Sequence, residues 1–118
     1  MANLAPNNGK RTAPKSDRTA LATPTDLKPN DVSAIAEALN MLVADAYALY
    51  VKTKNFHWHM SGPHFRDYHL LLDEQADQIF ASIDPLAERV RKLGAPTLKS
   101  IAQIAKMTRI KESQEEFV

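Results

Sequence analysis

The chain has 118 residues, of which 44% are hydrophobic and 25% are charged, and its formal net charge is +1 at pH 7. This length allows one domain and leaves no room for a large enzyme with a separate cofactor-binding domain, and the absence of Cys excludes disulfide scaffolds and Cys-based zinc or iron–sulfur sites. No apolar run approaches the ~18 residues of a membrane helix and no signal-peptide core follows Met1, so we expect a soluble, cytoplasmic protein without a membrane partner.

The first 29 residues are expected to form a disordered, mildly basic tail. Positions 1–30 carry five cations against two acids and few large apolar side chains, so they cannot bury enough apolar surface to offset the entropy of ordering them. The plain interpretation is a solvated linker. The sharper one is a phosphate-seeking arm that binds DNA without sequence preference. The residues that would contact DNA are Lys10, Arg11, Lys15 and Arg18.

Residues 30–118 are expected to form an all-α domain that starts with a long helix. Apolar residues from Val32 onward recur at three- and four-residue spacing, which predicts a helix over about 31–58. Asn30 or Asp31 would cap it, because either side chain accepts a hydrogen bond from a free first-turn N–H.

A second long helix is expected after the Ser61-Gly62-Pro63 turn. Its apolar residues fall every seven positions, with smaller ones between them: Phe65, Leu72, Ile79, Leu86 and Leu93, then Ala76, Ile83 and Val90. The heptad pattern stays in phase across Pro85, which predicts a kink and not a stop. Lys92 lies in the last turn, Gly94 is expected as a left-handed cap, and a short third helix is predicted over about 97–107.

Polar side chains border the core-facing stripe of the second helix. At about 100° per residue, with Phe65 at zero, they fall between roughly 40° and 140°. They form two pairs four residues apart, His69 with Asp73 and Asp84 with Glu88, and each pair points at a shared spot. Imidazole plus carboxylates suits a divalent metal such as Fe(II) or Zn(II), and His57 could reach the same region. The alternative is a solvated shoulder in which Glu88 pairs with Lys92.

The spacing of the two pairs favours a site shared between subunits. They are centred fifteen residues apart, which is roughly 22 Å along a helix, so no single ion can touch both. If a second copy packs antiparallel across a two-fold axis, one chain's first pair faces the other's second pair. A homodimer would then hold two mixed metal sites.

Several motifs around these residues closely resemble the Dps family, the mini-ferritins that protect bacterial DNA during starvation and oxidative stress. The motifs are Lys54-Asn55-Phe56-His57-Trp58-His59, Ser61-Gly62-Pro63-His64-Phe65, Leu72-Asp73-Glu74 and Asp84-Pro85-Leu86-Ala87-Glu88-Arg89. The spacing His-x11-His-x3-Asp-x10-Asp-x3-Glu matches the family's ferroxidase ligands at all five positions. The resemblance covers about residues 30–110.

The resemblance implies a ferroxidase with a ferritin-like helical bundle. His57, His69 and Asp73 would bind iron from one subunit, and Asp84 and Glu88 would come from its two-fold partner. Family members oxidise Fe(II) with hydrogen peroxide or oxygen, store the ferric product inside a twelve-subunit shell and shield DNA, and some bind DNA through a Lys-bearing N-terminal arm. Trp58, directly after the first ligand, would be a redox-active aromatic or an ordinary buried one.

The chain is shorter than the family's four-helix subunits. It supplies the first two long helices and the short connecting helix, so residues 30–118 are expected to be a ferritin-like domain truncated at its C-terminus. Two other functions stay open: a nucleoid protein acting through the basic tail, and a truncated, non-catalytic helical remnant. A zinc site built from His57, His59 and His64 is a minor alternative. A di-iron site inside one subunit is disfavoured, because no Glu-x-x-His motif occurs.

Overall fold

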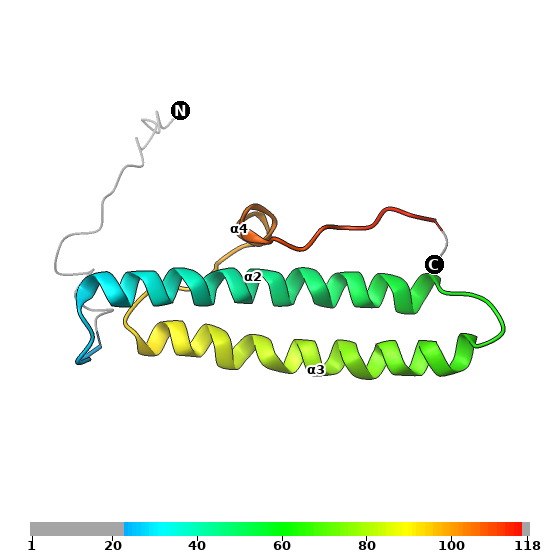
Figure 1. The fold of residues 1–118 in the computed structure, drawn as a ribbon, viewed down its shortest axis with the longest axis horizontal. Helices are drawn as coiled ribbons and strands as arrows, with labels where there is room; N and C mark the ends of the chain where they lie inside the picture. The colour runs from blue at the N-terminus through cyan, green and yellow to red at the C-terminus, as the bar shows by residue number, and fades with distance from the viewer. Residues whose placement is uncertain (1–22, 117–118) are drawn as a thin grey trace, which may run out of the picture.

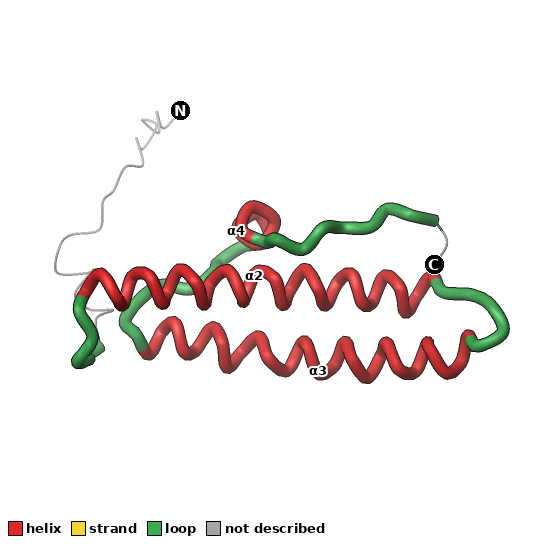
Figure 2. Tube along the Cα trace, in the orientation of Figure 1, coloured by secondary structure: helices red, strands yellow, loops and turns green. Residues whose placement is uncertain are grey.

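The structure is a computed structural model that describes residues 23–116. Two long helices, α2 (Pro29–His59) and α3 (Phe65–Lys92), lie side by side and antiparallel, and the short helix α4 (Ile101–Met107) packs against α2 (Figure 1). No strand occurs in the described part of the chain, and loops join the three helices (Figure 2). The expected all-α fold is confirmed. Positions 10–18, with the cations expected to contact DNA, lie outside the described residues.

Helix α2 starts at Pro29, two residues earlier than its predicted start at about residue 31. Lys28 is the N-cap and makes no side-chain capping bond, while Pro29 is the first helical residue. The prediction of Asn30 or Asp31 as cap is therefore wrong. Proline is well suited to the first helical position, because its fixed φ fits the helix and its missing N–H would be unpaired there anyway. Asp31 lies in the first turn, where its charge favours the helix dipole.

Helix α3 follows a tight turn and runs unbroken to its predicted end. Gly62 has φ of 108°, a conformation that glycine adopts without a steric cost. The helix continues through Pro85, so the prediction that this residue does not stop it is confirmed. Gly94 has φ of 84°, and its amide donates to the carbonyl of Arg91 at 2.9 Å, which confirms the left-handed cap.

Helix α4 begins four residues later than predicted, at Ile101. Ser100 caps it, with its hydroxyl oxygen accepting from the amide of Gln103 at 3.2 Å. The side chain of Gln103 accepts in return from the amide of Lys99 at 2.6 Å. This reciprocal pair satisfies the free amides of Lys99 and Gln103 and fixes the start of the helix after Ser100.

The interface between α2 and α3 is built mainly from small side chains. The buried apolar residues among those described are Ala36, Val43, Ala44, Ala76, Ile83 and Val90. The row at residues 76, 83 and 90 thus faces α2, and the predicted heptad stripe lies beside it, with Phe65 still 43% exposed. The sequence-based choice of the stripe at residues 65, 72 and 79 as the centre of the core was therefore wrong, because these larger side chains lie at the edge of the contact between the two helices.

Helix α2 has the length and apolar composition of a membrane-spanning segment, with a mean hydropathy of 1.4 in its most apolar window. Glu37 and Asp45 interrupt this helix, so it holds no continuous apolar run of about 18 residues, as expected from the sequence. Its packing against α3 and α4, and the polar contacts of Asn40 and Asp45, identify it as the central helix of the bundle. An amphipathic core helix meets the same length and composition test.

Asp45 fastens the segment after α4 to the middle of α2. Its carboxylate accepts from the backbone amide of Arg109 at 2.7 Å, from the Arg109 Nε at 2.9 Å and from the hydroxyl of Thr108 at 3.2 Å. Burial alone would raise the pKa of Asp45, but these hydrogen bonds from Arg109 and Thr108 outweigh it and lower the pKa. The contact spans more than sixty residues of sequence and holds α4 in place.

Replacing Asp45 with Ala is expected to lower the free energy of unfolding by about 1–2 kcal/mol at pH 7, because several charge-assisted hydrogen bonds are lost at a partly exposed site. Because the pKa of Asp45 is lower in the folded protein, its ionised carboxylate stabilises the fold fully above about pH 3.9, the ordinary carboxyl pKa in the unfolded chain. This stabilisation is lost as the pH falls through the lower pKa of the folded protein. Urea unfolding should therefore show a difference at pH 7 that shrinks below about pH 4. Glu37→Ala, an exposed acid on the same helix, is the control. Equal losses for the two variants would contradict the assignment.

Candidate metal centre

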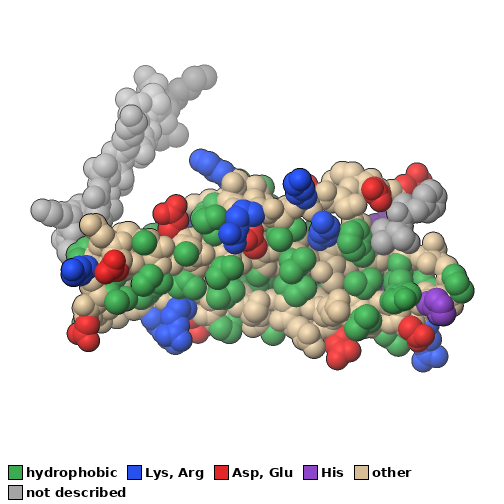
Figure 3. All heavy atoms as spheres, viewed as in Figure 1, with side chains coloured by type: hydrophobic (Ala, Val, Ile, Leu, Met, Phe, Trp, Pro, Cys, Tyr) green, Lys and Arg blue, Asp and Glu red, His purple; other side chains and the backbone are tan. Residues whose placement is uncertain are grey.

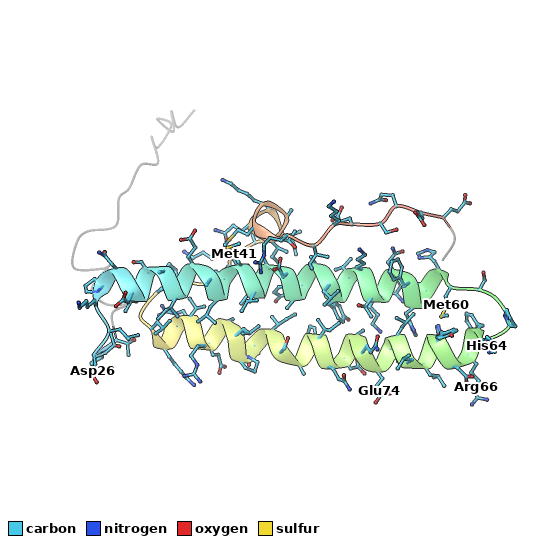
Figure 4. All side chains as sticks on the ribbon, viewed as in Figure 1. Asp26, Met41, Met60, His64, Arg66 and Glu74 are labelled. Atoms are coloured by element: carbon cyan, nitrogen blue, oxygen red, sulfur yellow. The ribbon has the colours of Figure 1, made fainter. Side chains whose placement is uncertain are left out.

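Two of the predicted ligands meet where the turn after α2 brings the chain back into α3. His57 is buried near the end of α2, and His69 is half-buried in the second turn of α3. Their rings stack with centroids 3.7 Å apart and 14° between planes. Phe65 stacks on the outer face of this pair, 4.9 Å from the His69 centroid. Figure 4 shows Met60 and His64 at this turn, and Arg66 and Glu74 pointing outward from the far side of α3.

Each of these histidines is oriented by the backbone of the other. The Nδ1 of His57 lies 2.6 Å from the carbonyl oxygen of His69, and the Nδ1 of His69 lies 2.8 Å from the carbonyl oxygen of His57. A carbonyl can only accept, so both rings must carry their proton on Nδ1. In the neutral rings the Nε2 atoms are then left with free lone pairs. This is the tautomer in which a histidine binds a metal while its other nitrogen is held by a backbone acceptor.

Asp73 lies beside the histidine pair and is engaged by a lysine. One carboxylate oxygen is 2.6 Å from the Lys54 Nζ and 3.8 Å from the His57 Nε2. The hydrogen bond with Lys54 holds the pKa of Asp73 below its ordinary value and raises the pKa of Lys54. Asp73 is therefore a carboxylate at neutral pH. The ammonium of Lys54 occupies the position from which a cation could approach it.

The remaining two predicted ligands lie elsewhere on α3. Asp84 and Glu88 are exposed, eleven and fifteen residues beyond Asp73, which is roughly 16 and 22 Å along the helix. The chain therefore brings His57, His69 and Asp73 together and keeps Asp84 and Glu88 apart from them. Within residues 23–116 no group of three or more His, Asp or Glu side chains is arranged to hold a metal ion.

Trp58 lies on a different side of α2 from the histidine pair. It is 63% exposed and lines an open groove of about 440 Å³ between α2, α4 and the segment that follows α4. It is thus not the buried aromatic of the plainer interpretation, and its redox role stays a prediction. His59 is held by Asn55 at 2.8 Å, and His64 meets Tyr68 edge-on. These two histidines have other partners, so the described structure does not form the three-histidine zinc site.

Sequence reasoning missed two residues of the site. Lys54 was noted only as part of a motif, although it lies one turn before His57 on the same face of α2. Phe65 was assigned to the core, although its place four residues before His69 puts it directly over that ring. Helical spacing carried both signals. Only the pairing of α2 with α3 shows that Lys54 reaches Asp73, nineteen residues away.

Comparison with known proteins shows which proteins the chain is similar to. A family model described as a ferritin-like domain matches residues 36–117. The DNA protection during starvation protein 1 of Deinococcus radiodurans is 38% identical over 89 residues, which is 75% of this chain and 43% of that protein. The chain spans about half the length of the curated relatives it matches.

Solved structures show the same fold. The crystal structure of antigen TpF1 from Treponema pallidum superposes with a TM-score of 0.76 at 34% identity, over 82% of this chain and 62% of that one. A Dps protein from Vibrio cholerae, described as a member of a broad superfamily of ferritin-like diiron-carboxylate proteins, gives a TM-score of 0.74 at 31% identity. The superposition covers 81% of this chain and 61% of that structure.

Proposed function

Because the chain belongs to the ferritin-like domain family, in its Dps branch, we propose that it binds Fe(II) at a site shared by two subunits and oxidises it as a ferroxidase. One half of the site is His57, His69 and Asp73. The other half is Asp84 and Glu88 of the partner subunit, at the far end of an antiparallel α3. The reaction takes Fe(II) as substrate and hydrogen peroxide or oxygen as oxidant, and yields ferric iron for storage.

The observation that carries this proposal is the hydrogen-bond geometry of the histidine pair. Both Nδ1 atoms lie against backbone carbonyls, so in the neutral rings both Nε2 lone pairs are free, and the His57 Nε2 lies 3.8 Å from the Asp73 carboxylate. A purely structural histidine pair would have no need to leave the same nitrogen free on each ring. Two imidazoles with one carboxylate leave a divalent ion short of ligands, and the exposed Asp84 and Glu88 of a second copy would supply them.

The carboxylates give the site its preference for the product. Asp73, Asp84 and Glu88 together bring three negative charges, which stabilise Fe(III) more than Fe(II) because the attraction scales with the charge of the ion. The imidazoles contribute neutral donors that are already oriented. The chain's own residues thus bind and position the ion, while the oxidant accepts the electrons.

The wider role we propose is that of the Dps branch: storage of iron in a cytoplasmic assembly and protection of DNA against iron and peroxide. A twelve-subunit shell and association with the nucleoid belong to this proposal. Contact with DNA through Lys10, Arg11, Lys15 and Arg18 stays a prediction from the sequence.

Replacing Lys54 with Met is expected to tighten binding of Co(II), a redox-stable substitute for Fe(II), by about two- to fivefold. The reason is that the ammonium on Asp73 must leave before a metal ion binds, and a half-exposed ion pair of this kind is weak. Calorimetric titration of the full chain measures the change.

Lys52→Met is the matched control, because the Lys52 Nζ donates to the carbonyl of Lys111 on another side of α2 at 2.8 Å. A wild-type chain that binds no Co(II) would overturn the proposed function. A wild-type chain that binds Co(II) as tightly as Lys54→Met would overturn only the role given to Lys54.

A further inference from the structure

Three aromatic rings form one stack at the end of the α2–α3 pair where the turn joins the two helices. The centroid of the His69 ring is 3.7 Å from that of His57 and 4.9 Å from that of Phe65, with 14° and 21° between the planes. Figure 3 shows hydrophobic side chains along both long helices up to this end of the molecule. Phe65 has no side-chain donor or acceptor and no metal-binding atom. Its contribution to the stack is therefore the face of its ring.

The turn between the helices places Phe65 over His69. Phe65 is the first residue of α3, and its backbone amide donates to the carbonyl of Gly62 at 3.2 Å. The positive φ of Gly62 is a conformation that other residues rarely adopt, and it sets the direction in which α3 starts. Side chains four residues apart share one face of a helix, so the Phe65 ring meets the His69 ring one turn further on. The phenyl ring is thus in place before any metal ion binds.

The plane of the His69 ring depends on what lies against its faces. The terminal torsion of a histidine has only broad intrinsic preferences, so it does not fix the plane by itself. The hydrogen bond from Nδ1 to the carbonyl of His57, at 2.8 Å, restrains one edge of the ring. The stacking contacts with His57 and Phe65 restrain its tilt. The direction in which the free Nε2 points therefore depends on Phe65 as well as on the hydrogen bond.

This contact is expected to strengthen when His69 binds a metal ion. Coordination through Nε2 draws electron density out of the imidazole and leaves its ring with a partial positive charge. The face of a phenyl ring carries negative potential and attracts a positively charged group that stacks on it. An aliphatic side chain would fill the same space without this attraction. The phenyl ring therefore favours the metal-bound form of His69 over the free form.

We propose that Phe65 is a positioning residue of the iron site, which stacks on His69, sets the plane of that imidazole and favours its metal-bound form. Phe65 does not touch the ion and acts only through His69. The inference rests on the proposed function, since Phe65 can act in this way only if His69 is a ligand.

The test is calorimetric titration of the full chain with Co(II) in variants of Phe65. Phe65→Leu keeps an apolar side chain but removes the ring, and it is expected to weaken Co(II) binding by about three- to tenfold, which is the range for one aromatic contact. Phe65→Tyr keeps the ring and should bind Co(II) within about twofold of wild type. Its added hydroxyl can reach water, because position 65 is partly exposed.

Phe80→Leu is the matched control. Phe80 lies on the same helix and is 57% exposed, but its ring meets Tyr50, with centroids 5.3 Å apart, and not a proposed ligand. Its replacement should leave the affinity for Co(II) within about twofold of wild type. Thermal unfolding of the metal-free variants measures the packing that each leucine substitution removes.

Weaker Co(II) binding in Phe65→Leu, with near wild-type binding in Phe65→Tyr and Phe80→Leu, supports the proposal. Unchanged affinity in Phe65→Leu, or equal losses in Phe65→Leu and either of the other variants, overturns it and leaves the proposed function in place. A wild-type chain that binds no Co(II) overturns both. If Phe65→Leu loses its helical circular dichroism signal, Phe65→Met, with a longer apolar side chain, decides by the same criteria.

Discussion

Replacing His69 with Ala is expected to lower the affinity of the chain for Co(II) by at least about 100-fold and to reduce Fe(II) oxidation to the rate of buffer alone. The variant removes one Nε2 donor and also the ring that orients His57, since the two side chains hold each other's backbone carbonyls. Loss of an orienting group alone commonly costs 10- to 100-fold in metal affinity, so loss of a ligand together with it should cost more. Calorimetry measures binding, and the absorbance of the ferric product measures oxidation.

His59→Ala is the matched control for this variant. His59 lies two residues after His57 on the same helix but is exposed and is held by Asn55. Its loss should leave Co(II) binding and oxidation within about twofold of wild type. Full activity in His69→Ala, or equal losses in the two variants, would remove the histidine pair from the site.

Mixing two inactive variants is expected to restore about a quarter of the wild-type oxidation rate if the site is shared between subunits. His69→Ala damages one half of the site and Asp84→Ala damages the other. In a random mixture about half of the dimers carry one chain of each kind, and each of these has one intact site and one doubly damaged site. The chains are refolded together from denaturant, and ferric absorbance is followed after addition of Fe(II) and peroxide.

The control mixture combines His69→Ala with Asp73→Ala. Both changes fall in the same half of the site, so every site in a mixed dimer contains one damaged half and no activity should return. Recovery in both mixtures, or in neither, would contradict a site formed by His69 of one chain and Asp84 of another.

The local features of the fold could be predicted from the sequence alone. The 3.6-residue periodicity gave the two long helices to within a few residues, and Gly94 gave the left-handed end of the second. Residues four apart on a helix share a face whatever surrounds them, so the adjacency of His69 and Asp73 needed no tertiary information. The distance of this pair from Asp84 followed from the helical rise in the same way. The starts of the helices were predicted less well. Pro29 as the first residue of α2 and Ser100 as the cap of α4 each compete with nearby residues that could also begin a helix.

The tertiary structure decided which helical row is buried and what the ligands contact. The larger heptad residues were the natural choice for the core, but the row formed by Ala76, Ile83 and Val90 is the one buried against α2. The Lys54–Asp73 pair, the reciprocal binding of His57 and His69 and the Asp45–Arg109 contact each join segments at least twelve residues apart. Helical periodicity relates only residues within a few turns of one another. Contacts between residues this far apart in the sequence depend on how the helices pair. Helical periodicity does not predict that pairing, so only the tertiary structure shows it.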